Sequence, residues 1–112
     1  MSTAVSLATV TDATFATEVG PGSGLVAVDF SAEWCTPCRF MTPIVEAVAQ
    51  EYAPQLRALQ IDADANPAST VRFGVRGLPT LLVFRDGVEV DRIVGAVSKA
   101  ALMERLARLV AM

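Results

Sequence analysis

The stretch LVAVDFSAEWCTPCRF, residues 25–40, decides the fold of this chain. Its first half, LVAVDFS at 25–31, is a nearly continuous apolar run rich in valine, which is typical of a central strand buried on both faces. Pro37 suits the first turn of a helix that continues to Tyr52, and we expect Pro43 to kink this helix. Apolar residues recur along it at helical spacing: Phe40, Met41, Ile44, Val45, Val48 and Ala49. A buried strand that runs almost directly into a helix indicates an α/β fold.

The residues before this stretch predict one strand, one helix and a loop. Residues 4–8 (AVSLA) alternate apolar and polar side chains, as a half-exposed strand does. Thr11 or Asp12 offers an N-cap for a helix that runs through Val19. The segment GPGSG at 20–24 then forces a loop that leads into the buried strand.

The residues after the long helix predict three strands and two helices. Strands are expected at 56–62, 81–84 and 88–94, and Asp86-Gly87 signals an antiparallel hairpin between the last two. A short helix is expected over 66–73, where the cap residue Asn66 precedes a proline, and Ser98 caps a closing helix. The closing helix has an apolar stripe and a polar face: Leu102, Leu106, Leu109 and Val110 against Lys99, Glu104, Arg105 and Arg108.

These elements follow the order βαβαβαββα, which predicts a five-stranded mixed sheet with helices on both faces. Strands separated by helices imply parallel pairing through right-handed crossovers, with one antiparallel hairpin at an edge of the sheet. The chain has 112 residues, which is the size of one ordinary domain, and contains no repeats or linkers. We therefore expect a single domain over residues 1–112.

Composition excludes several classes of function. Apolar residues make up 53% and charged residues 19%, a balance that can fill a core. The net charge of −3 and the nine scattered basic residues argue against binding to nucleic acid. The chain has no histidine, so it can contain neither a Cys-His nucleophile pair nor an imidazole metal ligand. No basic leader and no apolar run of about 20 residues occurs, so we expect a cytoplasmic protein without a membrane segment.

The motif WCTPC at 34–38 places two cysteines where the buried strand meets the long helix. At a helix N-terminus the dipole and the unpaired N–H groups stabilise a thiolate, so Cys35 is placed to be the nucleophile. Cys38, one turn later, lies within disulfide distance and can resolve a mixed disulfide formed on Cys35. An inert buried pair and half of a metal site shared with another chain are the alternatives, but this spacing favours reversible dithiol chemistry.

Three segments resemble the thioredoxin family in order and spacing, over essentially the whole chain: VDFSAEWCTPCR at 28–39, GVRGLPTLLVFRDG at 74–87 and VGAVSK at 94–99. The resemblance implies the thioredoxin fold and a thiol-disulfide oxidoreductase that reduces disulfides in client proteins. It also implies that no cofactor is bound and that electrons come from NADPH through thioredoxin reductase. We expect the protein to be a monomer.

The resemblance adds two positions close to the cysteines. Asp29 resembles the buried carboxylate that accepts the proton of the resolving cysteine, and burial should raise its pKa. The alternative is a carboxylate turned to solvent or bonded to a local amide, although alternation along the strand places Asp29 on one face with Leu25 and Ala27. Pro79 resembles a cis-proline that faces the disulfide, and the preceding Leu78 would contact the substrate backbone.

The resemblance also implies an apolar rim around the cysteines that recognises client proteins: Trp34, Thr36, Pro37, Leu78, Val94, Gly95 and Ala96. For Trp34, packing into the core is the alternative. Two other classes of function stay open. The chain could be a binding subunit that uses the fold as a clamp, or two copies could bridge a metal or an iron–sulfur cluster through their Cys-x-x-Cys motifs.

Four residues depart from the family pattern. Thr36 replaces the usual glycine between the cysteines, and Arg39 replaces the lysine that usually follows them. Ser31 stands where an aromatic residue is usual, and Gln60 stands where a lysine often lies near the buried carboxylate. These changes bear on the redox potential and on the titration of Asp29.

Overall fold

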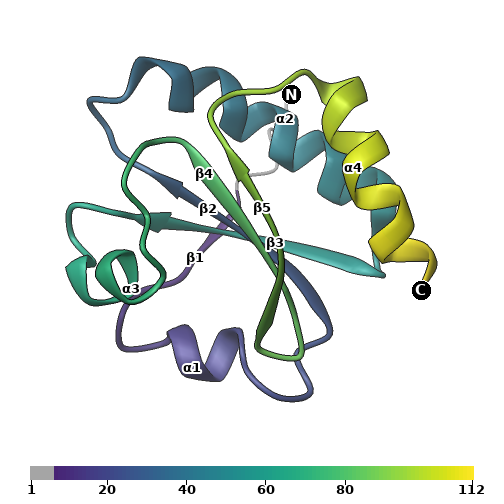
Figure 1. Ribbon diagram of the computed structural model, residues 1–112, viewed down its shortest axis with the longest axis horizontal. Coiled ribbons are helices and arrows are strands. Elements are labelled where there is room, and N and C mark those ends of the chain that lie inside the picture. The colour runs from purple at the N-terminus through teal and green to yellow at the C-terminus, as the bar shows by residue number, and fades with distance from the viewer. Residues whose placement is uncertain (1–6) are drawn as a thin grey trace, which may run out of the picture.

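The structure, a computed structural model, describes residues 7–112 and confirms the predicted order of elements (Figure 1). The elements are β1 (Ala8–Thr9), α1 (Phe15–Glu18), β2 (Leu25–Ser31), α2 (Thr36–Tyr52), β3 (Leu56–Asp62), α3 (Pro67–Arg72), β4 (Thr80–Arg85), β5 (Val88–Val94) and α4 (Lys99–Ala111). The five strands form one mixed sheet in the order β1-β3-β2-β4-β5, so β2 lies at its centre.

The pairing of β4 differs from the expectation that strands separated by helices run parallel. β1, β3 and β2 are parallel, but β4 is antiparallel to β2, and β5 is antiparallel to β4. The cause is the length of α3, whose six residues span about 9 Å against about 23 Å for the seven residues of β3. The connection from β3 to β4 is therefore too short to carry the chain back to the end of the sheet where β3 begins. β4 starts at the end where β2 finishes, with Thr80 opposite Phe30.

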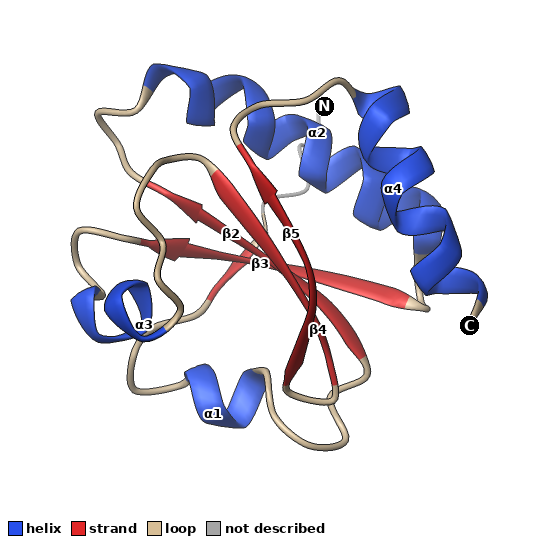
Figure 2. Ribbon diagram, in the orientation of Figure 1, coloured by secondary structure: helices blue, strands red, loops and turns tan. Residues whose placement is uncertain are grey.

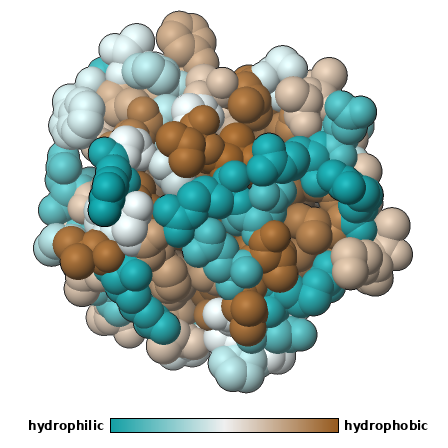
Figure 3. Space-filling model, viewed as in Figure 1, coloured by the Kyte–Doolittle hydropathy of each residue, from teal (hydrophilic) through white to brown (hydrophobic). Residues whose placement is uncertain are grey.

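Helices cover both faces of the sheet, as predicted (Figure 2). One core lies beneath α2 and α4 and includes Leu25 and Ala27, while the other lies toward α1 and α3 and includes Val26, Val28 and Phe30. All seven residues of β2 are buried, which confirms a central strand that packs on both faces. On the face shown in Figure 3, polar side chains interrupt the apolar surface.

The first helix is shorter than predicted. It begins after the N-cap Thr14 rather than after Thr11 or Asp12. The hydroxyl of Thr14 accepts a hydrogen bond from the N–H of Thr11, and this local turn delays the helix. Of the predicted strand at 4–8, residues 4–6 lie outside the described part of the chain, and the observed β1 has two residues.

Asp12 serves α3 instead of α1. Its carboxylate accepts hydrogen bonds from the N–H groups of Ala68 at 3.1 Å and Ser69 at 2.8 Å, which lie in the first turn of α3. Asn66 is the N-cap of α3, but its side-chain oxygen accepts from the N–H of Asp12 at 2.8 Å. Each side chain thus accepts hydrogen bonds from backbone N–H groups of the other segment. Local capping rules could not predict this pairing, because the two segments are far apart in the sequence.

The long helix α2 runs over 17 residues and contains Pro43. Its buried face consists of Cys38, Met41, Val45 and Val48. Phe40 was predicted to belong to this apolar face, and that prediction was wrong, because 69% of Phe40 is exposed. Phe40 is adjacent to Met41 in sequence, and a step of one residue turns a side chain by about 100° around the helix.

Two turn signals are confirmed. Asp86 and Gly87 both have positive φ, 50° and 86°, as a tight hairpin between β4 and β5 requires. The hydroxyl of Ser98 accepts a hydrogen bond from the N–H of Ala101 at 3.1 Å and so caps α4.

Candidate redox site

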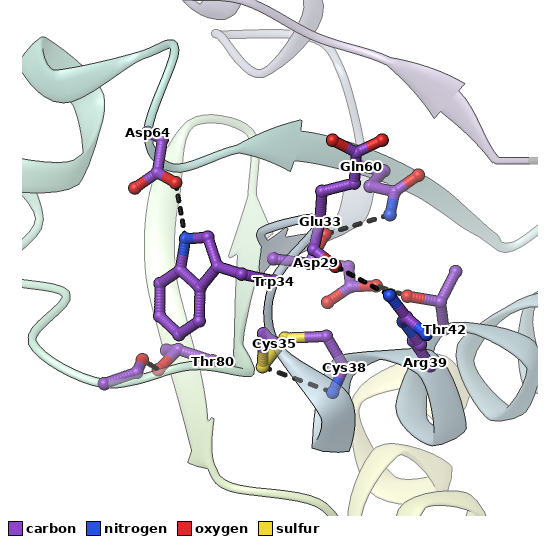
Figure 4. The surroundings of a disulfide bond; sticks show 12 residues. Asp29, Glu33, Trp34, Cys35, Cys38, Arg39, Thr42, Gln60, Asp64 and Thr80 are labelled. Carbon is purple, nitrogen blue, oxygen red and sulfur yellow. Dashed lines mark hydrogen bonds between the residues drawn. A yellow bond between two sulfur atoms is a disulfide. The ribbon is translucent and has the colours of Figure 1, made fainter.

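Cys35 and Cys38 form a disulfide at the junction of β2 and α2 (Figure 4). β2 ends at Ser31, and a short turn follows in which the N–H of Cys35 donates to the carbonyl of Ala32. Cys35 is the N-cap of α2, Pro37 lies in the first turn, and the Cα atoms of the two cysteines are 5.3 Å apart. The strand-to-helix junction therefore places the pair as the sequence predicted.

The start of α2 offers the first sulfur a hydrogen-bond donor. The backbone N–H of Cys38 donates to Sγ of Cys35, with the two atoms 3.3 Å apart. In the reduced protein the same N–H and the positive end of the helix dipole would favour a thiolate on Cys35 over a thiol. The start of α2 therefore presents a backbone donor to Sγ of Cys35.

Exposure does not separate the two cysteines in this disulfide form. Both side chains are 3% exposed. The reason is a small apolar cluster in which Ala32 and Leu78 pack against both cysteines. In the disulfide form, access to either sulfur therefore depends on this packing as well as on the helix start.

Asp29 lies at the centre of the sheet and is completely buried. The hydroxyl of Thr42 on α2 donates to its Oδ2 at 2.7 Å, whereas no residue within 7–112 provides a hydrogen bond to its Oδ1. Burial raises the pKa of Asp29 to about 6, the Thr42 hydrogen bond lowers it, and the negative charge of Glu46 raises it. This geometry excludes the alternative of a carboxylate turned to solvent.

An open cleft of about 490 Å³ lies between α2 and the ends of β2 and β3. Its lining includes Cys38, Thr42, Ser31 and Gln60. Gln60 is the partner of Asp29 in the sheet register, and its amide donates to the hydroxyl of Ser31 at 2.9 Å. Since Ser31 is small, no bulky side chain from this position fills the space beside Cys38.

Two loops meet near the disulfide. The Leu78-Pro79 peptide bond is cis, as predicted, and a second cis bond, Ala53-Pro54, was not predicted. The N–H of Gly95 donates to the carbonyl of Pro79 at 2.8 Å, which ties the end of β5 to the turn before β4. Figure 1 shows both loops at the same end of the sheet as the start of α2.

The predicted rim residues differ in exposure. Trp34 and Val94 are 67% and 68% exposed, so the alternative that Trp34 packs into the core is wrong. The remaining exposed members are Thr36, Pro37 and Ala96, while Leu78 and Gly95 are half-buried. Pro79 is buried beneath this surface.

Sequence reasoning missed three neighbours of the site. The indole N–H of Trp34 donates to the carboxylate of Asp64 at 2.6 Å (Figure 4). The only sequence feature that indicated an acceptor there is the pair of acidic residues at the end of β3, Asp62 and Asp64. Thr42 and Glu46 approach Asp29 from α2. The sequence could have indicated both residues, because Cys38, Thr42 and Glu46 follow one another at steps of four. This spacing places all three on one face of the helix.

The described residues hold neither a metal-binding cluster nor a membrane-spanning helix. Within residues 7–112, no group of three or more His, Cys, Asp or Glu side chains is arranged to hold a metal ion. In the same part of the chain, no helix is long and apolar enough to span a bilayer.

Comparison with known proteins gives a consistent result. The family description "Thioredoxin" matches residues 6–108. Thioredoxin 1 of Synechococcus elongatus is 46% identical over 99 residues, covering 88% of this chain and 92% of its own length. Thioredoxin of Mycobacterium tuberculosis is 46% identical over 101 residues, covering 90% and 87%, and that of Porphyra purpurea is 42% identical over 102 residues, covering 91% and 95%. This chain therefore belongs to the thioredoxin family of thiol-disulfide oxidoreductases, with Cys35 and Cys38 as its redox pair.

Proposed function

We propose that this protein reduces client disulfides with Cys35 as the nucleophile, Cys38 as the resolving thiol and Asp29 as the proton acceptor. One contact carries the assignment of the nucleophile: the N–H of Cys38 donates to Sγ of Cys35 at the first turn of α2. A donor in this position stabilises negative charge on Cys35, and the thiolate is the reactive form of cysteine.

The exchange has two steps. The Cys35 thiolate attacks a client disulfide, a bond forms between Sγ of Cys35 and one client sulfur, and the other client sulfur leaves and takes a proton. Cys38 then loses its proton, and its sulfur attacks Sγ of Cys35. The mixed disulfide breaks, the second client sulfur leaves and is protonated, and the two cysteines are oxidised to the disulfide seen in the structure. The client gains two electrons and two protons.

Asp29 is suited to receive the proton of Cys38. Its pKa of about 6 leaves it largely ionised at neutral pH, yet it is a far stronger base than an ordinary aspartate. A base whose pKa lies near the working pH is effective in proton transfer. The transfer from Cys38 would be direct or would pass through one water molecule.

The client surface is proposed to be the rim around the disulfide. Its members are Trp34, Thr36, Pro37, Leu78, Val94, Gly95 and Ala96, most of them apolar. The rim would recognise clients of varied sequence, because exposed apolar side chains bind without strict demands on the partner. Leu78, which packs against both cysteines, would offer its backbone to an extended client segment.

We propose that thioredoxin reductase and NADPH return the protein to its dithiol form, and that it acts in the cytoplasm as a monomer of one domain. The family membership supports this electron supply, since disulfide exchange with a reductase needs no cofactor on this chain. The alternatives of a clamp or a metal bridge are not favoured. The match to the thioredoxin family and the disulfide between Cys35 and Cys38 support disulfide exchange instead.

The electron supply is tested by a coupled assay. With thioredoxin reductase, NADPH and insulin as the disulfide substrate, the wild-type protein should drive NADPH oxidation in proportion to its concentration. Cys35→Ser should reduce the rate to background, because no mixed disulfide can form on serine. NADPH oxidation no faster than in the absence of the protein would contradict the proposal.

The assignment of the nucleophile is tested by alkylation. Brief iodoacetamide treatment of the reduced protein near neutral pH should label Cys35 before Cys38, since the helix start favours the Cys35 thiolate. Peptide mass spectrometry measures the ratio. In addition, Cys38→Ser should accumulate mixed disulfides with clients, whereas Cys35→Ser should not. Equal or reversed labelling would show that the roles are wrongly assigned.

The role of Asp29 is tested by Asp29→Asn. Its folded pKa is raised from 3.8 to about 6, so ionisation costs folding free energy that grows between about pH 4 and pH 6 and is fully present above. The oxidised variant should therefore be more stable than wild type at pH 7, by about 1–3 kcal/mol, and equally stable near pH 4. Urea unfolding at both values measures this difference.

The same variant should also slow the resolution of mixed disulfides in stopped-flow reduction, while the alkylation rate of Cys35 stays near that of wild type. The amide of asparagine cannot take up the proton of Cys38. Unchanged resolution together with unchanged or lower stability would assign Asp29 a purely structural role.

A further inference from the structure

Thr42 occupies an unusual position for a helical threonine. It lies on α2 one turn after Cys38, both residues line the open cleft, and its side chain is half-buried. Inside a helix a threonine hydroxyl commonly bonds to the carbonyl four residues earlier. Here the hydroxyl donates to Oδ2 of Asp29 at 2.7 Å instead, so it joins α2 to the central strand (Figure 4).

Within residues 7–112, no lysine or arginine donates a hydrogen bond to Asp29 or is a cause of its raised pKa. In the sheet register its neighbours are Gln60 on β3 and Leu81 on β4, and neither side chain ionises. On α2 lie Cys38, in its disulfide form and one turn before Thr42, and Glu46, whose negative charge opposes ionisation of Asp29. The charged residues Glu33, Arg39 and Asp62 line the neighbouring cleft. Within residues 7–112, Thr42 supplies the side-chain hydrogen bond to this carboxylate, and Oδ1 has no partner.

We propose that Thr42 is a positioning residue for proton transfer in this protein. By donating to Oδ2, its hydroxyl fixes the rotation of the Asp29 carboxylate and leaves Oδ1 as the unoccupied acceptor for the proton of Cys38. The same bond stabilises the ionised carboxylate, to which no lysine or arginine within residues 7–112 is hydrogen-bonded. This inference rests on the proposed role of Asp29 as the proton acceptor.

The open cleft beside Thr42 contributes to the arrangement. Thr42, Ser31 and Gln60 line it together with Cys38, and it opens to solvent beside the buried carboxylate. In the proposal, a proton accepted by Asp29 leaves toward this cleft, past the hydroxyl of Thr42. Thr42 stands between the cleft and the carboxylate, which allows one hydroxyl to affect both the basicity and the orientation of Asp29.

Two matched variants test the proposal. Thr42→Val keeps the shape of the side chain and removes the hydroxyl, whereas Thr42→Ser keeps the hydroxyl and removes a methyl group. Carbon-13 NMR titration of the Asp29 carboxyl in the oxidised protein measures its pKa without any turnover. Removing a donor to the ionised form should raise this pKa in Thr42→Val by about one pH unit, and Thr42→Ser should stay near wild type.

The kinetic readout is the pH profile of mixed-disulfide resolution. In Thr42→Val its midpoint should move upward with the Asp29 pKa, which lowers the rate roughly five-fold at pH 6 and little above pH 8. Alkylation of Cys35 should be unaffected, and Thr42→Ser should restore the wild-type profile. A variant that unfolds more easily but keeps the wild-type carboxyl pKa and midpoint would overturn the proposal.

Asp29→Asn, measured in parallel, distinguishes failure of the proposed role of Asp29 from failure of the proposed role of Thr42. If it resolves mixed disulfides as fast as wild type, the proposed role of Asp29 fails, and the role of Thr42 fails with it. If Asp29→Asn is slow but Thr42→Val has a wild-type pKa and profile, only the inference about Thr42 is wrong. Should Thr42→Val unfold, Thr42→Ala gives the same two readouts.

Discussion

The burial of β2 on both faces is the constraint on which the site depends. Because the strand is central and fully buried, its two ends are fixed, and the chain that leaves Ser31 reaches the start of α2 in a short turn. The same burial fixes Asp29 on the face beneath α2, since alternate residues of the strand point to opposite cores. One strand thus brings both the disulfide and the buried carboxylate against the first two turns of α2.

The residue proposed as the proton acceptor is costly for the stability of the fold. A carboxylate without a positive neighbour in a buried position weakens the fold at neutral pH, and an unpaired Oδ1 adds to that cost. Such violations of packing rules are common at functional sites, where the rest of the fold compensates for them. Two apolar cores on either side of the sheet supply that compensation here. The hydroxyl of Thr42 offsets part of the cost without neutralising the base.

Much of this arrangement could be predicted from the sequence, because the decisive signals are local. The apolar run of β2, the Cys-x-x-Cys spacing, the Asp86-Gly87 turn and the Ser98 cap each act within a few residues. The antiparallel β4 could not be predicted in this way, since it depends on the length of α3 relative to a strand.

Contacts between distant segments were also missed. Asp12 resembled a local cap in sequence but bonds to α3, and Trp34 finds its acceptor in Asp64. The sequence predicts that Thr42 lies in a helix. Its hydrogen bond to Asp29 could not be predicted, because it depends on how α2 packs on β2. Local propensity and spacing do not report such pairings.

An equilibrium redox titration of the Cys35–Cys38 pair in thiol buffers of known potential tests the central claim most directly. A rigid helix start with Pro37 is typical of reducing members of the family. The account therefore predicts a two-electron transition below about −200 mV, nearer the reference value of about −270 mV for thioredoxin than that of strongly oxidising relatives. A midpoint above about −200 mV would place the protein among oxidising or isomerising proteins and contradict its role as a reductant.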